Sequence, residues 1–449
     1  MKYILIVVGL ALLLPLSGWL RRNPQHSRIV WIVMGALPFV ISAGPHALYV
    51  AVISWATWPG YVKGAEVSLI DLLALAIYIS QPRSRYRLPF RTSMGLYFVA
   101  IVFSSMTGSI PEASFFYVWQ LARMFLVYSI VTNACSSDER VAPALMTGMA
   151  VGLWIAVVFA AWQRVHSDVI QASGTVSEKN LFGMMSQFVG IPWFALLLSG
   201  QKGRLPYLAP LGTALAAVLT VSRAALGLTA AGLGLLLVIS GVRKWTPRKA
   251  KIAAMSVASL IVLVPLAVTS LEDRFGAKPV QSDYDERAAF ERAAAMMAAD
   301  NPLGVGSNNY VIVANVRGYN EKAKVAPTRT SLSTSVHNVY LLTLAEAGIF
   351  GLVAFLIMLF VLLFVAFHCG WKNRKDERGD LLLGFGVSLL VVYFHSLYEW
   401  IFLMFPTQYL FAMTAGMVAG LAQQLGYWQR VRVPAGRVAQ GMVQNHPTI

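Results

Sequence analysis

Long apolar runs recur along the whole chain, and they constrain its fold more than any other feature of the sequence. The runs are about 15 to 30 residues long, and roughly 20 residues are enough for a helix to cross a bilayer. With 57% hydrophobic and 12% charged residues, the chain does not have the composition of a set of soluble domains. We expect an all-α polytopic membrane protein with about twelve transmembrane helices. The runs are 3 to 20, 29 to 43, 66 to 80, 93 to 108, 114 to 134, 143 to 165, 180 to 199, 205 to 221, 224 to 241, 251 to 270, 337 to 367, 381 to 402 and 405 to 425.

The net charge of +16 indicates topology rather than nucleic-acid binding, because basic residues gather in the connectors between apolar runs. By the positive-inside rule, these connectors and the C-terminal tail face the cytoplasm. Counting spans from them places residues 271 to 336 outside, while the side on which residue 1 lies stays open. Gly44-Pro45 could break a helix or form a hairpin, so residues 29 to 60 stay open too. The basic clusters are Arg83, Arg85, Arg87 and Arg91; Arg243, Lys244, Arg248, Lys249 and Lys251; Lys372, Arg374, Lys375 and Arg378; and Arg430, Arg432 and Arg437.

Residues 271 to 336 form a long polar interruption, and we expect a large external loop that contains helices. Their eight basic and eight acidic residues cancel, and a polar insertion of this length between membrane helices is usually functional or disordered. Ser282 is placed to cap a helix rich in alanine, which Asn301-Pro302 would end. The chain then divides into an N-terminal membrane bundle (1–270), the loop (271–336), C-terminal membrane helices (337–425) and a basic cytoplasmic tail (426–449).

His337 stands where the polar loop meets the apolar run that begins at Val339. We expect it in the first turn of a membrane helix, where the positive end of the helix dipole helps to keep the imidazole neutral. A neutral histidine near arginines suits a reaction that deprotonates a hydroxyl beside an anionic leaving group. A capping or interfacial histidine is the alternative. Asn338, and Asn180 at the start of the run 180 to 199, are possible substrate-binding or structural residues.

Four charged residues are further candidates, three in apolar surroundings and one on the polar loop. Arg223 lies between two apolar runs, so it could bind a substrate at the external face or reach out to the lipid headgroups. Arg287, on the predicted loop helix, could grip a phosphate with its forked guanidinium or pair with Glu291. Arg123 and Glu399 could contact substrate, or they could pair with each other or with backbone to hold helices together.

The histidine belongs to a longer pattern that resembles bacterial O-antigen ligases. His337-Asn338, nine residues, Gly348, two residues and Gly351 match the pattern H-[NSQ]-x9-G-x-x-[GTY] of that family. The two glycines lie roughly 16 to 21 Å further along the helix at 1.5 Å per residue, too deep for the same chemistry. We expect them to allow close helix packing.

The residues around this pattern follow the order of the same family and of the related O-antigen polymerases. Ser222-Arg223-Ala224 comes first, Arg287 with Phe290 follows, and the segment 302 to 306 precedes the histidine. The resemblance covers residues 174 to 402. The chain departs from the family at Phe290, where the family has tryptophan, and at Ala224, where it often has glycine. Both replacements are small chemical changes.

The resemblance implies a glycosyltransferase of the bacterial inner membrane, similar to the GT-C class, whose active site and large loop face the periplasm. Such a ligase moves O-antigen polysaccharide from undecaprenyl pyrophosphate to a sugar hydroxyl of lipid A-core, with membrane lipids around it. His337 would act as the base and Arg223 and Arg287 would bind the pyrophosphate, with inversion at the anomeric carbon. The family uses neither metal nor cofactor, although Asp283-Tyr284-Asp285 spells the short D-x-D motif of metal-dependent transferases.

Three other functions stay open at the level of sequence. An O-antigen polymerase would use the same donor with a second lipid-linked glycan as acceptor, and a protein O-oligosaccharyltransferase would use a protein. A lipid-linked sugar flippase or transporter belongs to a different class. The chain shows no clear internal repeat, and its polar candidates collect on one side of the membrane, which favours an enzyme over a transporter.

Overall fold

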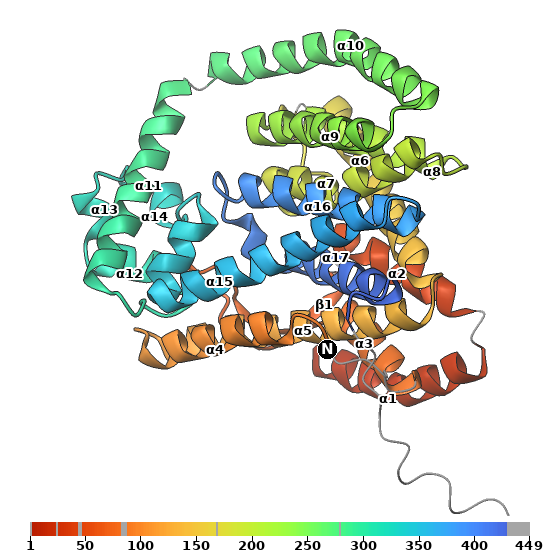
Figure 1. The fold of residues 1–449 in the computed structure, drawn as a ribbon. Coiled ribbons are helices and arrows are strands. Elements are labelled where there is room, and N and C mark those ends of the chain that lie inside the picture. Colours follow the sequence, from red (N-terminus) through yellow and green to blue (C-terminus); the bar gives the residue numbers. More distant parts are fainter. Residues whose placement is uncertain are drawn as a thin grey trace, which may run out of the picture.

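The computed structural model describes residues 2–23, 26–43, 47–81, 88–167, 169–277 and 280–428, which form a helical bundle with one β-hairpin. The elements are α1 (Lys2–Arg22), α2 (Ser27–Val40), β1 (Tyr49–Ser54), β2 (Gly64–Ser68), α3 (Leu69–Ser80), α4 (Arg91–Thr107), α5 (Pro111–Ser137), α6 (Val141–His166), α7 (Lys179–Ser199), α8 (Leu205–Thr220), α9 (Arg223–Arg243), α10 (Pro247–Ala277), α11 (Val280–Asp300), α12 (Tyr310–Val316), α13 (Tyr319–Lys322), α14 (Arg329–Leu332), α15 (Val339–Lys372), α16 (Glu377–His395), the 3₁₀ helix η2 (Ile401–Leu403) and α17 (Phe405–Gln424). Helices α11 to α14 gather at one end of the bundle (Figure 1).

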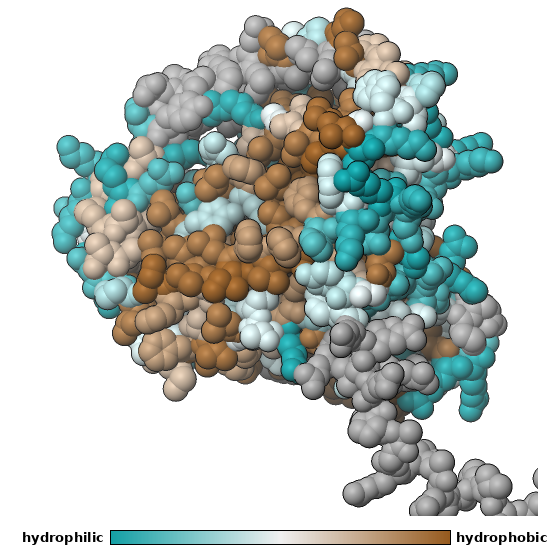
Figure 2. Space-filling model, in the orientation of Figure 1, coloured by the Kyte–Doolittle hydropathy of each residue, from teal (hydrophilic) through white to brown (hydrophobic). Residues whose placement is uncertain are grey.

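Six helices in the described ranges are long and apolar enough to cross a membrane: α5, α6, α7, α9, α15 and α16. Helices α2, α3 and α8 are apolar but shorter. Apolar side chains cover the middle of the molecule and hydrophilic ones its two ends (Figure 2). The chain is therefore a multi-pass membrane protein, while the total of about twelve spans stays a prediction. The basic residues expected at positions 83 to 87, and the tail from 429 onward, lie outside the described residues.

Helix α7 lies at the centre of the bundle. Its residues Leu181 to Leu198 are all buried, and the helix packs against α8, α9, α16 and α17. Small residues let the neighbours approach closely, since a Cβ atom at Gly190 would lie 2.3 Å from Thr213 Oγ1. A helix that is apolar on all sides belongs in such a core. This burial fixes the position of the helix N-terminus, which carries Lys179 and Asn180.

A β-hairpin interrupts the helices after α2. Strands β1 and β2 pair antiparallel, with Tyr49 opposite Ser68. Ser68 then caps α3 through a capping box with Asp71. Helix α2 ends at Val40, and the hairpin turns between Ser54 and Gly64, so the structure does not decide between the two alternatives for Gly44-Pro45. Gly44-Pro45 itself lies outside the described residues. The fold is mostly helical, as the all-α prediction requires, with this hairpin as an unpredicted addition.

The polar segment after α10 folds as a compact helical cap on the end of the bundle. Helix α10 continues to Ala277, past the boundary placed at residue 270, and α11 begins at Val280. Ser282 therefore lies inside α11, so the prediction that it caps the helix is wrong. Helix α11 packs against α13 and α15. The cap is tied together by side chains, for example Tyr310, whose hydroxyl donates to the carbonyl oxygen of Phe290 at 3.2 Å.

Helix α15 breaks at Gly348, where the backbone reaches φ 67° and ψ −171°. The segment 302 to 306 docks into the break. The amide of Gly306 donates to the carbonyl oxygen of Glu346 at 2.9 Å, and the amide of Ile349 donates to that of Pro302 at 3.1 Å. Only glycine adopts this conformation without strain. The expectation of simple helix packing is therefore wrong at Gly348, which receives a loop instead.

Residues just after this segment hold the connection between β1 and β2 against α15. The side-chain amide of Asn308 makes two hydrogen bonds to the backbone of Val62. Its Nδ2 donates to the Val62 carbonyl oxygen at 2.7 Å, and its Oδ1 accepts from the Val62 amide at 3.0 Å. The buried carboxyl of Glu346 accepts from the Tyr61 hydroxyl at 2.7 Å and from the Tyr310 amide at 2.9 Å. The connection between β1 and β2, the cap and α15 thus form one polar junction.

We predict that Gly348→Ala destabilises the protein by roughly 1–3 kcal/mol, because the positive φ is strained for alanine. The new Cβ atom would also lie 2.4 Å from the Pro302 carbonyl oxygen. Thermal unfolding of the purified protein measures the effect. Gly234→Ala on α9 is the matched control, since its Cβ would meet no atom within 4 Å. Equal melting temperatures for the two variants would contradict the docking role of Gly348.

Candidate functional site

The buried carboxylate of Glu399 joins three residues that sequence analysis had singled out. Its Oε2 atom lies 2.9 Å from His337 Nδ1. Its Oε1 atom accepts from Arg287 Nη2 at 3.1 Å and from Asn180 Nδ2 at 2.9 Å. Glu399 itself is only 3% exposed. The structure therefore gathers His337, Arg287, Asn180 and Glu399 into one site at the end of the bundle that carries α11.

Local structure explains how His337 reaches this position. Asn338 is the N-cap of α15, and its side chain accepts from the amides of Tyr340 and Leu341. His337 therefore lies one residue before the cap, rather than in the first turn as predicted. The amide of Val339 donates to the carbonyl oxygen of Ser396 at 2.9 Å, which joins the start of α15 to the end of α16. Asn338 has a structural role in this arrangement.

Two residues of the cap complete the surroundings of His337. The ring of Phe290 lies 6.0 Å from the imidazole, measured between ring centroids. Arg287, one turn earlier on α11, also donates through Nη1 to the carbonyl oxygen of Tyr398 at 3.0 Å. Arg287 pairs with Glu399 rather than with Glu291, while phosphate binding by Arg287 stays a prediction. The side chains of Arg287 and His337 stay 33% and 25% exposed.

Electrostatics keep Glu399 ionised although it is buried. Burial alone would raise the pKa of the carboxyl group, but the hydrogen bond and charge of His337 lower it, with further help from Arg287 and His395, so the net shift is downward. A carboxylate accepts hydrogen bonds only, so the proton between the two side chains belongs to His337 Nδ1. In the neutral form of the ring, the other nitrogen, Nε2, then carries the lone pair that a base needs.

Arg223 lies at the first residue of α9, directly after the N-cap Ser222. This end of α9 meets the start of α7, since a Cβ atom at Gly183 would lie 2.7 Å from the Cβ of Ala225. The start of α7 in turn reaches Glu399 through Asn180. The N-termini of α7, α9 and α15 therefore lie near one another, and helix N-termini favour anions.

Sequence reasoning missed Lys179, the first residue of α7. Its amino group donates to Gln171 Oε1. The Gln171 side chain also reaches the carbonyl oxygens of Thr220 and Val221, at 3.5 and 3.4 Å, just before Arg223. Lys179 thus adds a cation directly before Asn180 and is linked through Gln171 to the backbone that precedes Arg223. The sequence did contain a signal for Lys179, namely a basic residue at the start of an apolar run. Such a position is where a membrane helix begins.

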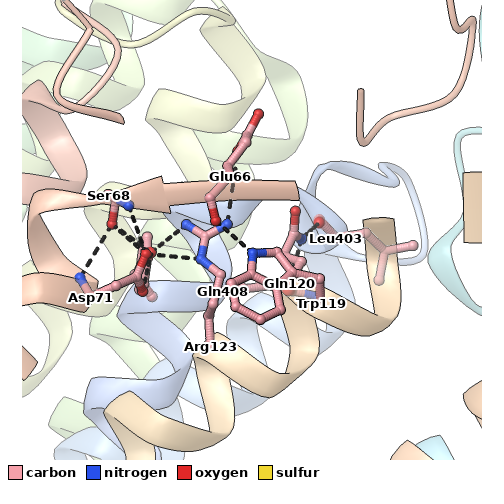
Figure 3. A network of polar contacts seen from close by, with 9 residues as sticks. Glu66, Ser68, Asp71, Trp119, Gln120, Arg123, Leu403 and Gln408 are labelled. Atoms are coloured by element: carbon pink, nitrogen blue, oxygen red, sulfur yellow. Dashed lines mark hydrogen bonds and ion pairs between the residues drawn. The ribbon is translucent and has the colours of Figure 1, made fainter. Parts of the chain in front are cut away.

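Arg123 belongs to a different cluster, and its predicted pairing with Glu399 is wrong. Arg123 Nε donates to Asp71 Oδ2 at 2.9 Å (Figure 3). Its Nη2 donates to the Tyr409 hydroxyl at 2.5 Å. Glu66 Oε2 lies 3.9 Å from Nη1. Arg123 is 5% exposed. This closed network joins α5 to the hairpin, α3 and α17, so Arg123 holds the bundle together.

The structure describes the side chain of one residue of the D-x-D motif. The side chains of Asp283 and Tyr284 lie outside the described residues, and Asp285 is exposed. Within the described residues, no three His, Cys, Asp or Glu side chains lie close enough to hold a metal ion. Metal independence stays a prediction from the family resemblance.

Comparison with known families connects this geometry to a class of proteins. Residues 208–356 match the family model described as O-Antigen ligase. The matched segment includes Arg223, Arg287 and His337. A search of curated proteins found no match. The similarity to this family model supports the O-antigen ligase superfamily and a general O-antigen ligase-type function for this multi-pass membrane protein.

We predict that Arg123→Met lowers the free energy of unfolding by about 3–5 kcal/mol, because it leaves the buried carboxylate of Asp71 without its cation. Thermal unfolding in detergent measures the loss. The double variant Arg123→Met/Asp71→Asn should recover part of it, since the uncompensated charge is then gone. An Arg123→Met protein as stable as wild type would instead indicate that Arg123 serves a ligand.

We predict that Glu66 makes stability pH-dependent. Burial raises the pKa of Glu66 to about 7, against the opposing charge of Arg123. A raised pKa means that the folded state favours the protonated acid. The contribution of Glu66 to the free energy of unfolding is therefore complete at low pH and is lost as pH rises through about 7. Glu66→Gln should therefore raise the melting temperature at pH 8 and leave it nearly unchanged at pH 5. The same difference at both pH values would contradict this assignment.

Proposed function

We propose that the protein is an O-antigen ligase that transfers a polysaccharide from undecaprenyl pyrophosphate to a sugar hydroxyl of lipid A-core. The observation that carries the proposal is the carboxylate of Glu399, which contacts both His337 and Arg287, two residues of the matched segment. A base and a phosphate-binding cation side by side are what glycosyl transfer from a pyrophosphate needs.

His337 acts as the general base in this proposal. A sugar hydroxyl is a weak nucleophile, so Nε2 takes its proton as the oxygen attacks the anomeric carbon of the donor. The bond from that carbon to the pyrophosphate oxygen breaks with its electron pair, and the configuration inverts. Glu399 accepts a hydrogen bond from Nδ1–H, which orients the ring and stabilises the imidazolium that forms.

The leaving pyrophosphate needs positive charge rather than a proton. Arg287 and Arg223 supply forked guanidinium donors, and Lys179 adds a third cation. The N-termini of α7, α9 and α15 add partial positive charge at the same place. Together these groups stabilise the anion without a metal ion, in line with the predicted metal independence and the absence of a cofactor.

The proposed setting is the bacterial inner membrane, with the cap formed by α11 to α14 in the periplasm. The polyprenyl tail of the donor then stays in the bilayer while its pyrophosphate meets the cations at the end of the bundle. The glycan and the core sugar of the acceptor lie in water beyond them. This arrangement accounts for a site with partly exposed His337 and Arg287 above buried helices.

We predict that purified protein ligates glycan to lipid A-core with chelator present, and that His337→Ala slows this by about two to four orders of magnitude, because the base is lost. Transfer from an undecaprenyl-pyrophosphate glycan to lipid A-core is followed on gels. His368→Ala, at the other end of α15 and exposed, is the matched control and should retain full activity.

Three results would contradict this proposal in different ways. Longer glycans on the lipid carrier without ligation would indicate a polymerase that uses the same site. Activity lost in chelator and restored by magnesium or manganese would overturn metal independence. Unchanged function in His337→Ala would favour a transporter, whose path through the bilayer needs no base.

A further inference from the structure

Arg243 is a buried charge at the end of the bundle opposite to the Glu399 site. It is the last residue of α9, a helix of 21 residues that begins with Arg223. At 1.5 Å per residue the two ends of α9 lie roughly 30 Å apart, about the thickness of a bilayer core. The Arg243 side chain is 4% exposed, and its Nη1 atom donates to Asp380 Oδ1 in the first turn of α16. This cation therefore takes no part in the site described above.

One edge of the Arg243 guanidinium has no protein partner. Within the part of the chain that the structure describes, the Nε and Nη2 atoms are buried and make no hydrogen bond. The N–H groups of these two atoms are parallel, so together they match two oxygens of one carboxylate or phosphate. A buried donor without an acceptor costs free energy, and the cost is larger for a charged group. This edge therefore has the geometry and the charge to bind an anion.

Other arginines at this end of the bundle show how such donors are satisfied. The Nε and Nη2 atoms of Arg378 both donate to the carboxylate of Asp376, at 3.0 and 2.7 Å. Arg248 uses all three of its nitrogens on carbonyl oxygens at the end of α7. Among these three arginines of the described ranges, Arg243 is the one whose Nε–Nη2 edge is unpaired.

A second cation makes the surroundings of Arg243 more positive. Lys249, in the first turn of α10, is 7% exposed, and its Nζ donates to the carbonyl oxygens of Ser240 and Lys244 at 2.7 Å each. It lies close enough to Arg243 and Asp380 to interact with both charges. Two cations thus share one carboxylate, although buried charges are normally paired.

We propose that the Nε–Nη2 edge of Arg243, with Lys249 beside it, binds the phosphate of an anionic phospholipid headgroup. The basic clusters predict that this end of the bundle faces the cytoplasm, and basic pockets between membrane helices on that side bind anionic headgroups. The exposed side chains of Val242 and Trp245 flank the end of α9, and exposed tryptophan is typical of the headgroup layer. The position therefore favours a lipid over a free phosphate ion.

The guanidinium lies just below the surface of the protein. Its partner Asp380 is 25% exposed, and Lys244, the residue after Arg243, is exposed. A headgroup therefore reaches the buried edge after movement of side chains around it, without a change in the helices. The site is separate from the proposed ligase chemistry, so its test needs no enzymatic activity.

The proposal predicts that purified protein in a neutral detergent binds dihexanoyl-phosphatidylglycerol through Arg243, with the Kd measured by thermophoresis. Arg243→Lys keeps a positive charge beside Asp380 but lacks the paired N–H groups. It should bind roughly 10- to 100-fold more weakly, the loss expected for hydrogen bonds to a charged group. Arg378→Lys is the matched control, because Asp376 already fills the same edge of Arg378, and it should bind like wild type.

A second variant keeps the test decisive if Arg243→Lys does not fold. Lys249→Gln removes the other cation and leaves the pair of Arg243 with Asp380, and it should weaken binding several-fold. An unchanged Kd in the folded variants would overturn the site. Equal binding of dihexanoyl-phosphatidylcholine by wild type would overturn the preference for an anionic headgroup. Arg243-dependent binding of inorganic phosphate, without such binding of phosphatidylglycerol, would overturn the assignment to a lipid.

Discussion

The buried carboxylate of Glu399 is the interaction on which the site depends. It contacts His337, Arg287 and Asn180, residues that belong to three separate elements of the chain. An ionised carboxylate at this depth is stable only with such partners, because desolvation would otherwise favour the neutral acid. The same contacts that keep Glu399 charged therefore fix the start of α7, the cap helix α11 and the entry to α15 relative to one another.

Polar contacts, in addition to apolar burial, fix the position of the cap on the bundle. The break at Gly348 accepts the segment 302 to 306, and Asn308 and Glu346 extend this junction to the connection between β1 and β2. Tyr61 in that connection also lies 6.1 Å from the ring of Trp400, the residue after Glu399. A continuous set of contacts thus runs from the helix break to the carboxylate, and it explains why irregular backbone is tolerated between membrane helices.

Two buried charge clusters in the same bundle differ in what they can do. Around Arg123, the carboxyl of Asp71 and the hydroxyl of Tyr409 close the network, and water has little access. Around Glu399, His337 and Arg287 remain partly exposed. A closed cluster can only stabilise packing, whereas an open one can exchange partners with a ligand. Exposure, rather than residue type, therefore separates the structural arginine from the candidate catalytic group.

The sequence by itself determined the membrane helices and the candidates His337, Arg223 and Arg287, because hydropathy, helix signals and the histidine pattern are read from neighbouring residues. It did not predict the β-hairpin, the loop inserted at Gly348 or the role of Lys179, and it offered Arg123 as a partner for Glu399. These features depend on contacts between residues far apart in the chain. Only the tertiary structure decided that Glu399 joins His337 to Arg287. The free-energy cost of burying a charge depends on its hydrogen-bond and ion-pair partners, and the fold determines which partners those are.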